Sequence, residues 1–182
     1  MARPPVTRYS APAQVFHWLI AILVLVAFIY GPGGSEHRVY DTARDAERQL
    51  HETLGASVLV LSALRLVWRF LDVRPEPVPA ARWMQLAARA LQGALYLLLF
   101  LVPLTAICGA WLEGHPVTLL GGIAFAPPFA ESHALGETIA EVHGWLGDVI
   151  LWLAGAHAVA ALYHHFLLKD GVLRSMLPGG ER

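Results

Sequence analysis

Residues Glu141 to Lys169 read EVHGWLGDVILWLAGAHAVAALYHHFLLK, a stretch apolar enough to cross a membrane that nevertheless carries four histidines. His143, His157 and His164 are fourteen and seven residues apart, spacings that a 3.6-residue helix returns to nearly one face. At a rise of about 1.5 Å per residue, His143 and His157 lie roughly 21 Å apart along the axis, at opposite depths of a ~30 Å hydrocarbon core. Because ionisable side chains inside a membrane usually face the bundle interior, this stripe predicts two sites stacked across the bilayer.

The composition of the whole chain points to an integral membrane protein. Hydrophobic residues make up 56% of the 182 residues and charged residues only 15%, with a mean hydropathy of +0.51. A single cysteine, Cys108, excludes an internal disulfide and a multi-cysteine iron–sulfur centre. With a net charge of −1 and no basic stripe, nucleic acid is not an expected partner. The length favours one domain over residues 1–182.

Three further apolar stretches lie before residue 141 in the chain, so the sequence predicts an all-α, integral membrane four-helix bundle. The expected spans are about 13–30, 51–70, 86–111 and 141–168. A charged loop at 31–50 and a proline-rich linker at 71–82 separate the first three spans. The loop at 112–140 is the longest connection and is expected to cover one end of the bundle. The first apolar run lacks a small-residue cleavage motif, so it is expected to be a retained span and not a signal peptide.

The distribution of Lys and Arg predicts the orientation of these spans. With the N-terminus inside, three arginines of the first loop would lie outside, namely Arg38, Arg44 and Arg48. The larger set on the cytoplasmic side would be Arg3, Arg8, Arg69, Arg74, Arg82, Arg89, Lys169, Arg174 and Arg182. Because cytoplasmic segments near span ends carry an excess of Lys and Arg, both termini are expected in the cytoplasm.

In this orientation four histidines fall into two levels. His17 and His157 lie toward the cytoplasmic side of their spans, whereas His51 and His143 lie at external ends. Each level thus receives two imidazoles from separate helices, which is what haem ligation by two axial nitrogens requires. Polar packing or a proton relay without haem is the alternative interpretation.

Small residues and one arginine share the face of His51. Gly55, Ser62 and Arg65 follow it at +4, +11 and +14, so the face has room for a flat ring. Arg65 reaches the depth of the cytoplasmic pair, His17 and His157, which is called the lower pair below. A guanidinium at this depth could pair with a haem propionate. Three glycines similarly flank the histidines of the last span, namely Gly144, Gly147 and Gly155. Membrane helices also use small residues simply to pack, so the glycines alone decide little.

Several short motifs along the chain belong together. They are Phe16-His17-Trp18, His51-Glu52-Thr53-Leu54-Gly55, Arg65-Leu66-Val67-Trp68-Arg69, Glu141-Val142-His143-Gly144, Gly155-Ala156-His157, Ala161-Leu162-Tyr163-His164-His165 and Lys169-Asp170. As an ordered set covering nearly the whole chain, they resemble the prokaryotic cytochrome b561 family. The resemblance implies a multi-pass protein of the bacterial inner (plasma) membrane with two b-type haems, held by His17 with His157 and by His51 with His143.

The resemblance also implies an activity. In its best-understood form the family oxidises superoxide at the external side and passes the electron to ubiquinone in the lipid bilayer. Other members look like electron-carrying partners of dehydrogenases, so a non-catalytic di-haem conduit is the alternative. A proton or metal transporter using the histidine stripe is a third and weaker hypothesis.

The remaining polar residues give weaker indications. Arg38, Arg44 and Arg48 could attract superoxide to an exposed haem edge. Four acidic residues on the same side oppose such a field, namely Glu113, Glu131, Glu137 and Glu141. Candidates for a cytoplasmic haem-propionate or quinone site are His164, Arg65 and Arg69, although the arginines could simply mark the membrane boundary. Interfacial or solvated positions are expected for His37, His115, His133 and His165.

Overall fold

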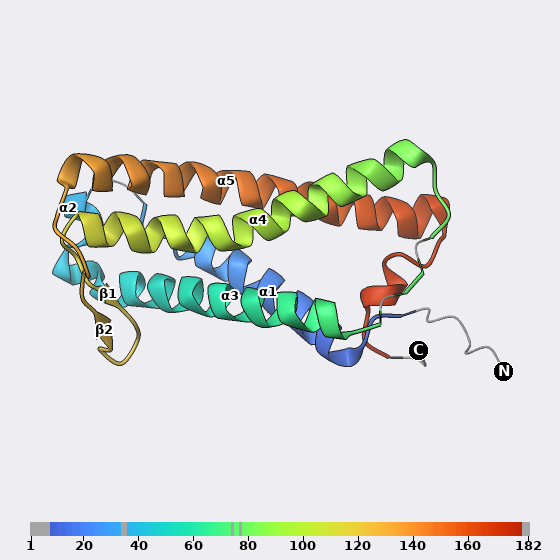
Figure 1. Cartoon of the computed structure of the whole chain (residues 1–182), viewed down its shortest axis with the longest axis horizontal. Coiled ribbons are helices and arrows are strands. Elements are labelled where there is room, and N and C mark those ends of the chain that lie inside the picture. Colours follow the sequence, from blue (N-terminus) through green and yellow to red (C-terminus); the bar gives the residue numbers. More distant parts are fainter. Residues whose placement is uncertain (1–7, 34–35, 74, 77, 180–182) are drawn as a thin grey trace.

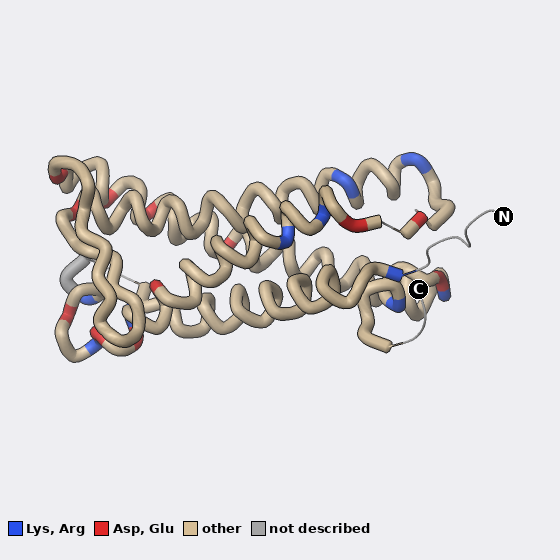
Figure 2. The backbone as a smooth tube through the Cα atoms, turned by 60° about the horizontal axis from the view of Figure 1, so that its bottom comes forward, with Lys and Arg blue, Asp and Glu red and all other residues tan. Residues whose placement is uncertain are grey.

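The computed structural model describes residues 8–33, 36–73, 75–76 and 78–179. Within these residues, four long helices run side by side as an elongated bundle (Figure 1). They are α1 (Ala11–Ile29), α3 (Asp45–Leu71), α4 (Arg82–Leu112) and α5 (His133–Tyr163). All four are long and apolar enough to cross a membrane, and the charged residues gather toward the two ends (Figure 2). The prediction of a mostly helical chain with four membrane-length helices is confirmed.

The helices pack as two pairs. α1 lies along α3 and α4 lies along α5, whereas α1 and α5 contact each other only sparsely. A small core of five buried side chains joins the bundle, namely Ile20, Val58, Leu98, Leu99 and Ile150. Most other apolar side chains on the helices are exposed, and on membrane-length helices these are the surfaces that lipid would cover.

α3 begins within the charged loop that the sequence predicted at 31–50. Its first turn carries Asp45 and Glu47, whose negative charges favour a helix N-terminus. Arg48 then bonds Asp45 at 2.7 Å and Glu52 at 3.0 Å, pairs spaced as helical neighbours. These side chains stabilise an extra helical segment before the apolar span, so α3 begins at Asp45 and not at about residue 51 as predicted. The shorter elements α2 (Glu36–Val39) and η1 (Thr42–Arg44) precede it.

α5 likewise begins earlier, at His133 instead of about residue 141, because its first turns pack on the end of α4. A Cβ added at Gly136 would lie 2.7 Å from the Glu113 side chain. One at Gly109 would lie 3.3 Å from the backbone nitrogen of Ala140. These close approaches between helices require small residues and extend the α4–α5 pair beyond the apolar stretch.

The rest of the 112–140 connection is not a plain loop. It contains a two-stranded antiparallel hairpin, β1 (Val117–Thr118) with β2 (Ala124–Phe125), which lies beside the start of α3 (Figure 1). At the opposite end of the bundle, a π-helical turn η2 (His164–Leu168) and a 3-10 turn η3 (Arg174–Met176) follow α5. This last segment meets the start of the chain, because the Trp18 indole N–H donates to the Met176 carbonyl at 2.8 Å.

Candidate functional site

Two pairs of histidine rings face each other inside the bundle. The ring centroids of His51 on α3 and His143 on α5 are 6.0 Å apart, and those of His17 on α1 and His157 on α5 are 6.2 Å apart. In both pairs the ring planes cross at 81°. Two imidazoles bound on opposite sides of one metal ion, each at ~2 Å from nitrogen to metal, have centroids about 6 Å apart. The spacing of both pairs therefore matches that of two axial ligands.

Hydrogen bonds fix two of these rings. The Nδ1 atoms of His51 and His143 lie 2.9 Å from the carbonyl oxygens of Ala27 and Val102. A carbonyl oxygen only accepts, so each Nδ1 carries a proton, and a neutral ring bonded in this way keeps its lone pair on Nε2. Ala27 lies in the last turn of α1, where carbonyls lack a helical partner. Such a bond to the second nitrogen commonly orients a metal-binding histidine.

Glycines near the rings have open space beside them. A Cβ built on any of four glycines near these histidines would meet nothing within 4 Å. They are Gly55, Gly144, Gly147 and Gly155. In the part of the chain that is described, no three His, Cys, Asp or Glu side chains gather around a common point. A haem iron needs only two protein nitrogens because the porphyrin supplies the other four. The donor set and the open space thus fit a flat macrocycle at each pair.

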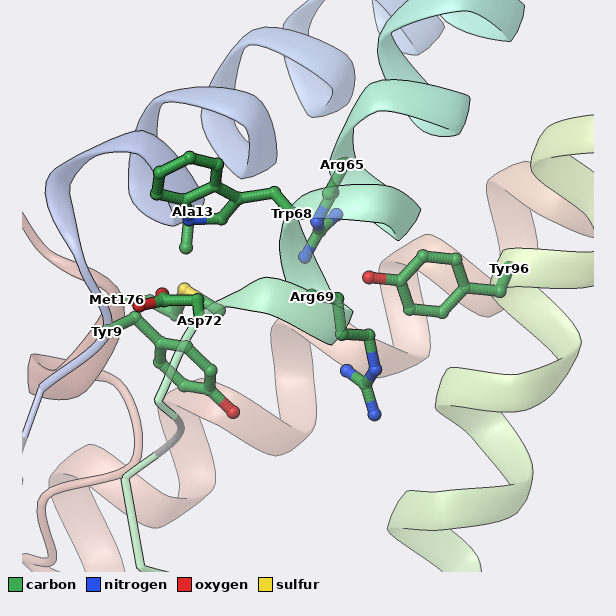
Figure 3. A pocket seen from close by; sticks show the side chains of 8 residues that line it. All are labelled: Tyr9, Ala13, Arg65, Trp68, Arg69, Asp72, Tyr96 and Met176. Carbon is green, nitrogen blue, oxygen red and sulfur yellow. The ribbon is translucent and has the colours of Figure 1, made fainter.

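A pocket that contains two arginines lies at the level of His17 and His157. The guanidinium carbons of Arg65 and Arg69 each lie 5.4 Å from the ring centroid of Tyr96, and Figure 3 shows both arginines with this ring. Arg65 lies within electrostatic range of His17 and His157. The pocket is lined by Tyr9, Ala13, Arg65, Trp68, Arg69, Asp72, Tyr96 and Met176. Cation–π contacts hold both arginines at this level, next to the histidine pair.

His164 lies beyond the two pairs and is bonded to an acid. Its Nδ1 lies 2.5 Å from Asp170, which returns toward the helix because Lys169 adopts a left-handed conformation with φ 55°. Burial alone would raise the pKa of Asp170. The hydrogen bonds from His164 and from the Val172 N–H outweigh burial and hold that pKa below its ordinary range.

Replacing Asp170 by asparagine should lower stability at neutral pH by about 0.5–1 kcal/mol, the upper part of the range for solvent-exposed pairs, since this pair is part-buried. A carboxylate with a lowered folded pKa stabilises the fold above its unfolded pKa of about 3.9, and this stabilisation disappears as the pH falls through the folded value. Thermal unfolding in detergent should therefore show a gap between native and variant protein at pH 7 that closes in acid. The exposed Glu76→Gln substitution serves as the control without a gap. A gap that persists in acid would show that the carboxylate charge is not responsible.

The arginines at the His51 end of the bundle differ in burial and in ion pairing. Arg48 is buried, bonded to Asp45 and Glu52, and lies 5.3 Å over the Tyr40 ring. It therefore has a structural role at the start of α3. Arg38 is exposed, and the Arg44 guanidinium makes an exposed contact with Glu47 at 3.4 Å.

The other histidines lie away from the two pairs. His115 stacks on Tyr40 at 3.4 Å between ring centroids, and the side chain of His133 is largely exposed near Glu131. The ring of His165 packs against the next residue, Phe166. The side chain of His37 lies outside the described residues.

Two polar residues of the lower end had no predicted role. Tyr96 lies among apolar residues of α4, and only its depth, close to that of Arg65, could have indicated a shared site. Asp170 lies six residues after His164, beyond helical contact distance, so its pairing depends on the turn at Lys169. Depth along neighbouring spans is thus the signal that would have identified Tyr96.

Comparisons with known proteins agree with one another. Residues 8–179 match the family model described as prokaryotic cytochrome b561. The chain is 32% identical over 171 residues to cytochrome b561 homolog 2 of Escherichia coli K12, covering 93% of this chain and 91% of that protein. It is 36% identical over 177 residues to cytochrome b562 of Cereibacter sphaeroides, covering 93% and 94%. A protein named probable superoxide oxidase CybB, from Yersinia pestis, is 29% identical over 175 residues, covering 94% and 96%.

Proposed function

Because the chain belongs to the prokaryotic cytochrome b561 family, we propose that it is a di-haem superoxide:ubiquinone oxidoreductase. The family makes it a membrane electron-transfer protein that binds haem b. One observation carries the proposal of two haems. Two histidine pairs, each with about 6 Å between ring centroids, lie at two levels of one bundle. The similarity to a protein named probable superoxide oxidase supports the choice of electron donor.

The four histidines would hold the two haems. His51 and His143 would bind one and His17 and His157 the other, each through a ring nitrogen. Haem b, when bound, supplies reversible one-electron oxidation and reduction. The carbonyls of Ala27 and Val102 keep two of the rings in one tautomer and orientation.

Other residues would act at the two ends. Arg38 and Arg44 would raise the local concentration of superoxide at the His51 end. Two superoxide anions would each give up one electron and leave as O2. Ubiquinone would take those two electrons together with two protons and leave as quinol. Arg65 and Arg69 would pair with haem propionates or with the quinone. His164, bonded to Asp170, would pass protons from the cytoplasmic side to the quinone.

The orientation remains the one inferred from charge. We place both termini in the cytoplasm and the His51 end outside the inner membrane, with one domain over residues 1–182. Supporting arginines within the described residues include Arg8, Arg69, Arg82 and Arg174, whereas Arg3, Arg74 and Arg182 lie outside them.

Stopped-flow mixing of oxidised, haem-loaded protein with superoxide should give fast reduction of the haem bands, followed by reoxidation when ubiquinone is added. Because the donor is an anion, removing a positive charge at the His51 end should slow reduction, and this difference should shrink as ionic strength rises. Arg38→Glu should slow reduction several-fold at low salt, whereas Arg89→Glu at the opposite end should not. Slow reduction of fully loaded protein would contradict superoxide oxidation and leave a non-catalytic conduit that receives electrons from a dehydrogenase.

A further inference from the structure

The hairpin between α4 and α5 has an unusual composition for a segment outside the spans. From Pro116 to Ala130 the sequence PVTLLGGIAFAPPFA contains no charged residue. Four of its large apolar side chains are about half exposed or more, namely Leu120 at 49%, Ile123 at 60%, Phe125 at 50% and Phe129 at 45%. A segment surrounded by water would expose polar groups, and apolar side chains gathered in this way mark a surface that is normally covered.

The hairpin has a defined shape. Its turn closes with a bond from the Gly122 N–H to the Leu119 carbonyl at 3.0 Å, and Gly121 supplies the positive φ of 90° that this turn needs. The Trp111 indole N–H donates to the Phe125 carbonyl at 3.0 Å, which ties the second strand to the end of α4. The exposed apolar side chains are thus carried by an ordered element.

Two side chains of α3 determine where the hairpin lies. The Glu52 carboxylate accepts from the Thr118 N–H, and the Thr53 hydroxyl accepts from the Leu120 N–H at 2.8 Å. Figure 1 shows the hairpin extending sideways past α3, across the direction of the bundle axis. The apolar tip consequently points away from the bundle and lies beside its end.

The face of α3 below the hairpin is the one that lipid would cover. Val60, Leu64 and Val67 follow Thr53 at +7, +11 and +14, so all four residues share one face. The three apolar residues are 58%, 50% and 57% exposed. Val60 lies only about 10 Å along the helix from Thr53. The apolar tip is therefore continuous with the membrane-facing surface of α3.

From this continuity we propose that the β1–β2 hairpin lies in the membrane interface at the His51 end, with its apolar tip among lipid headgroups and the first acyl carbons. Interfacial amphipathic helices, which use the same combination of an apolar face and a membrane boundary, place that face about 5–10 Å into the headgroup and acyl region. The absence of charge in residues 116–130 and the sideways projection favour lipid over a soluble protein as the occupant. The inference does not depend on which haem ligands or substrates the protein uses.

Spin labelling tests the proposal directly, because the chain has a single cysteine, Cys108. In a Cys108→Ser background, labels would be attached to Ile123→Cys, to Val60→Cys as the lipid-facing reference, and to Glu131→Cys as the aqueous reference in the same connection. The haem-loaded protein would be placed in vesicles of phosphatidylcholine and phosphatidylglycerol. Relaxation of each label by oxygen, which concentrates in lipid, would be compared with relaxation by a water-soluble nickel chelate.

The label at Ile123 should be relaxed by oxygen over nickel in a ratio close to that at Val60 and several-fold above that at Glu131. A ratio equal to that at Glu131 would overturn the proposal, because the tip would then lie in water. Protection from both reagents would also overturn it, since a protein and not lipid would then cover the tip. Leu120→Cys, on the same turn, repeats the measurement if the first variant does not fold.

Discussion

Replacing His157 by alanine should remove one of the two proposed haems from the purified protein. The lower haem would lose one of its two axial nitrogens, and the facing ring of His17 could not replace it from the opposite side. The pair His51 and His143 would be unaffected, because it lies roughly 21 Å away along α5. Haem extraction with a protein assay, together with the absorption spectrum of the b bands, measures the loss.

A second histidine on the same helix provides the control. His133→Ala removes a largely exposed side chain of α5 and should leave both haems and the full spectrum. An unaltered spectrum in His157→Ala would show that this residue is not a ligand. Should that variant fail to accumulate, His143→Ala tests the same model at the other level, where the lower haem should remain.

Replacing Gly55 by leucine should prevent binding of the haem proposed between His51 and His143. The substitution has opposite expected effects depending on what occupies the space beside the glycine. If that space were simply open, a leucine there would raise helix stability by about 0.8 kcal/mol. If a haem occupies it, the side chain would collide with the macrocycle one turn from His51 and prevent binding. Haem content and thermal unfolding, measured on one preparation, distinguish the two results.

Gly93 allows a matched comparison. It also lies within a helix with nothing within 4 Å of an added Cβ, but it is exposed on α4. Gly93→Leu should therefore keep both haems. Full haem content in Gly55→Leu, with the same gain in stability as in Gly93→Leu, would contradict a macrocycle beside Gly55.

Periodicity and depth were enough to predict the central arrangement. The spacing of His143 and His157 placed them at two depths, and counting from the span ends gave His17 and His51 the same two depths. The structure brings together these two pairs across separate helices. This works because rise per residue and membrane thickness are fixed quantities, so depth can be counted along each span.

Features that depend on contacts between distant segments could not be predicted in this way. The hairpin at 117–125 has strands of two residues each, and side chains of Glu52 and Thr53 hold its backbone. Similarly, the start of α5 depends on its close approach to α4 at Gly136. Neither contact leaves a local pattern, because the partners are separated by many residues of chain.

The sparse contact between α1 and α5 bears on how the protein is made in the cell. α1 and α3 pack together and are synthesised first, so this half can form while α4 and α5 are still emerging. Each proposed haem site needs one histidine from this half and one from α5. Capture of each proposed haem would thus come last in synthesis, after α5 has packed on the half that α3 and α4 already connect.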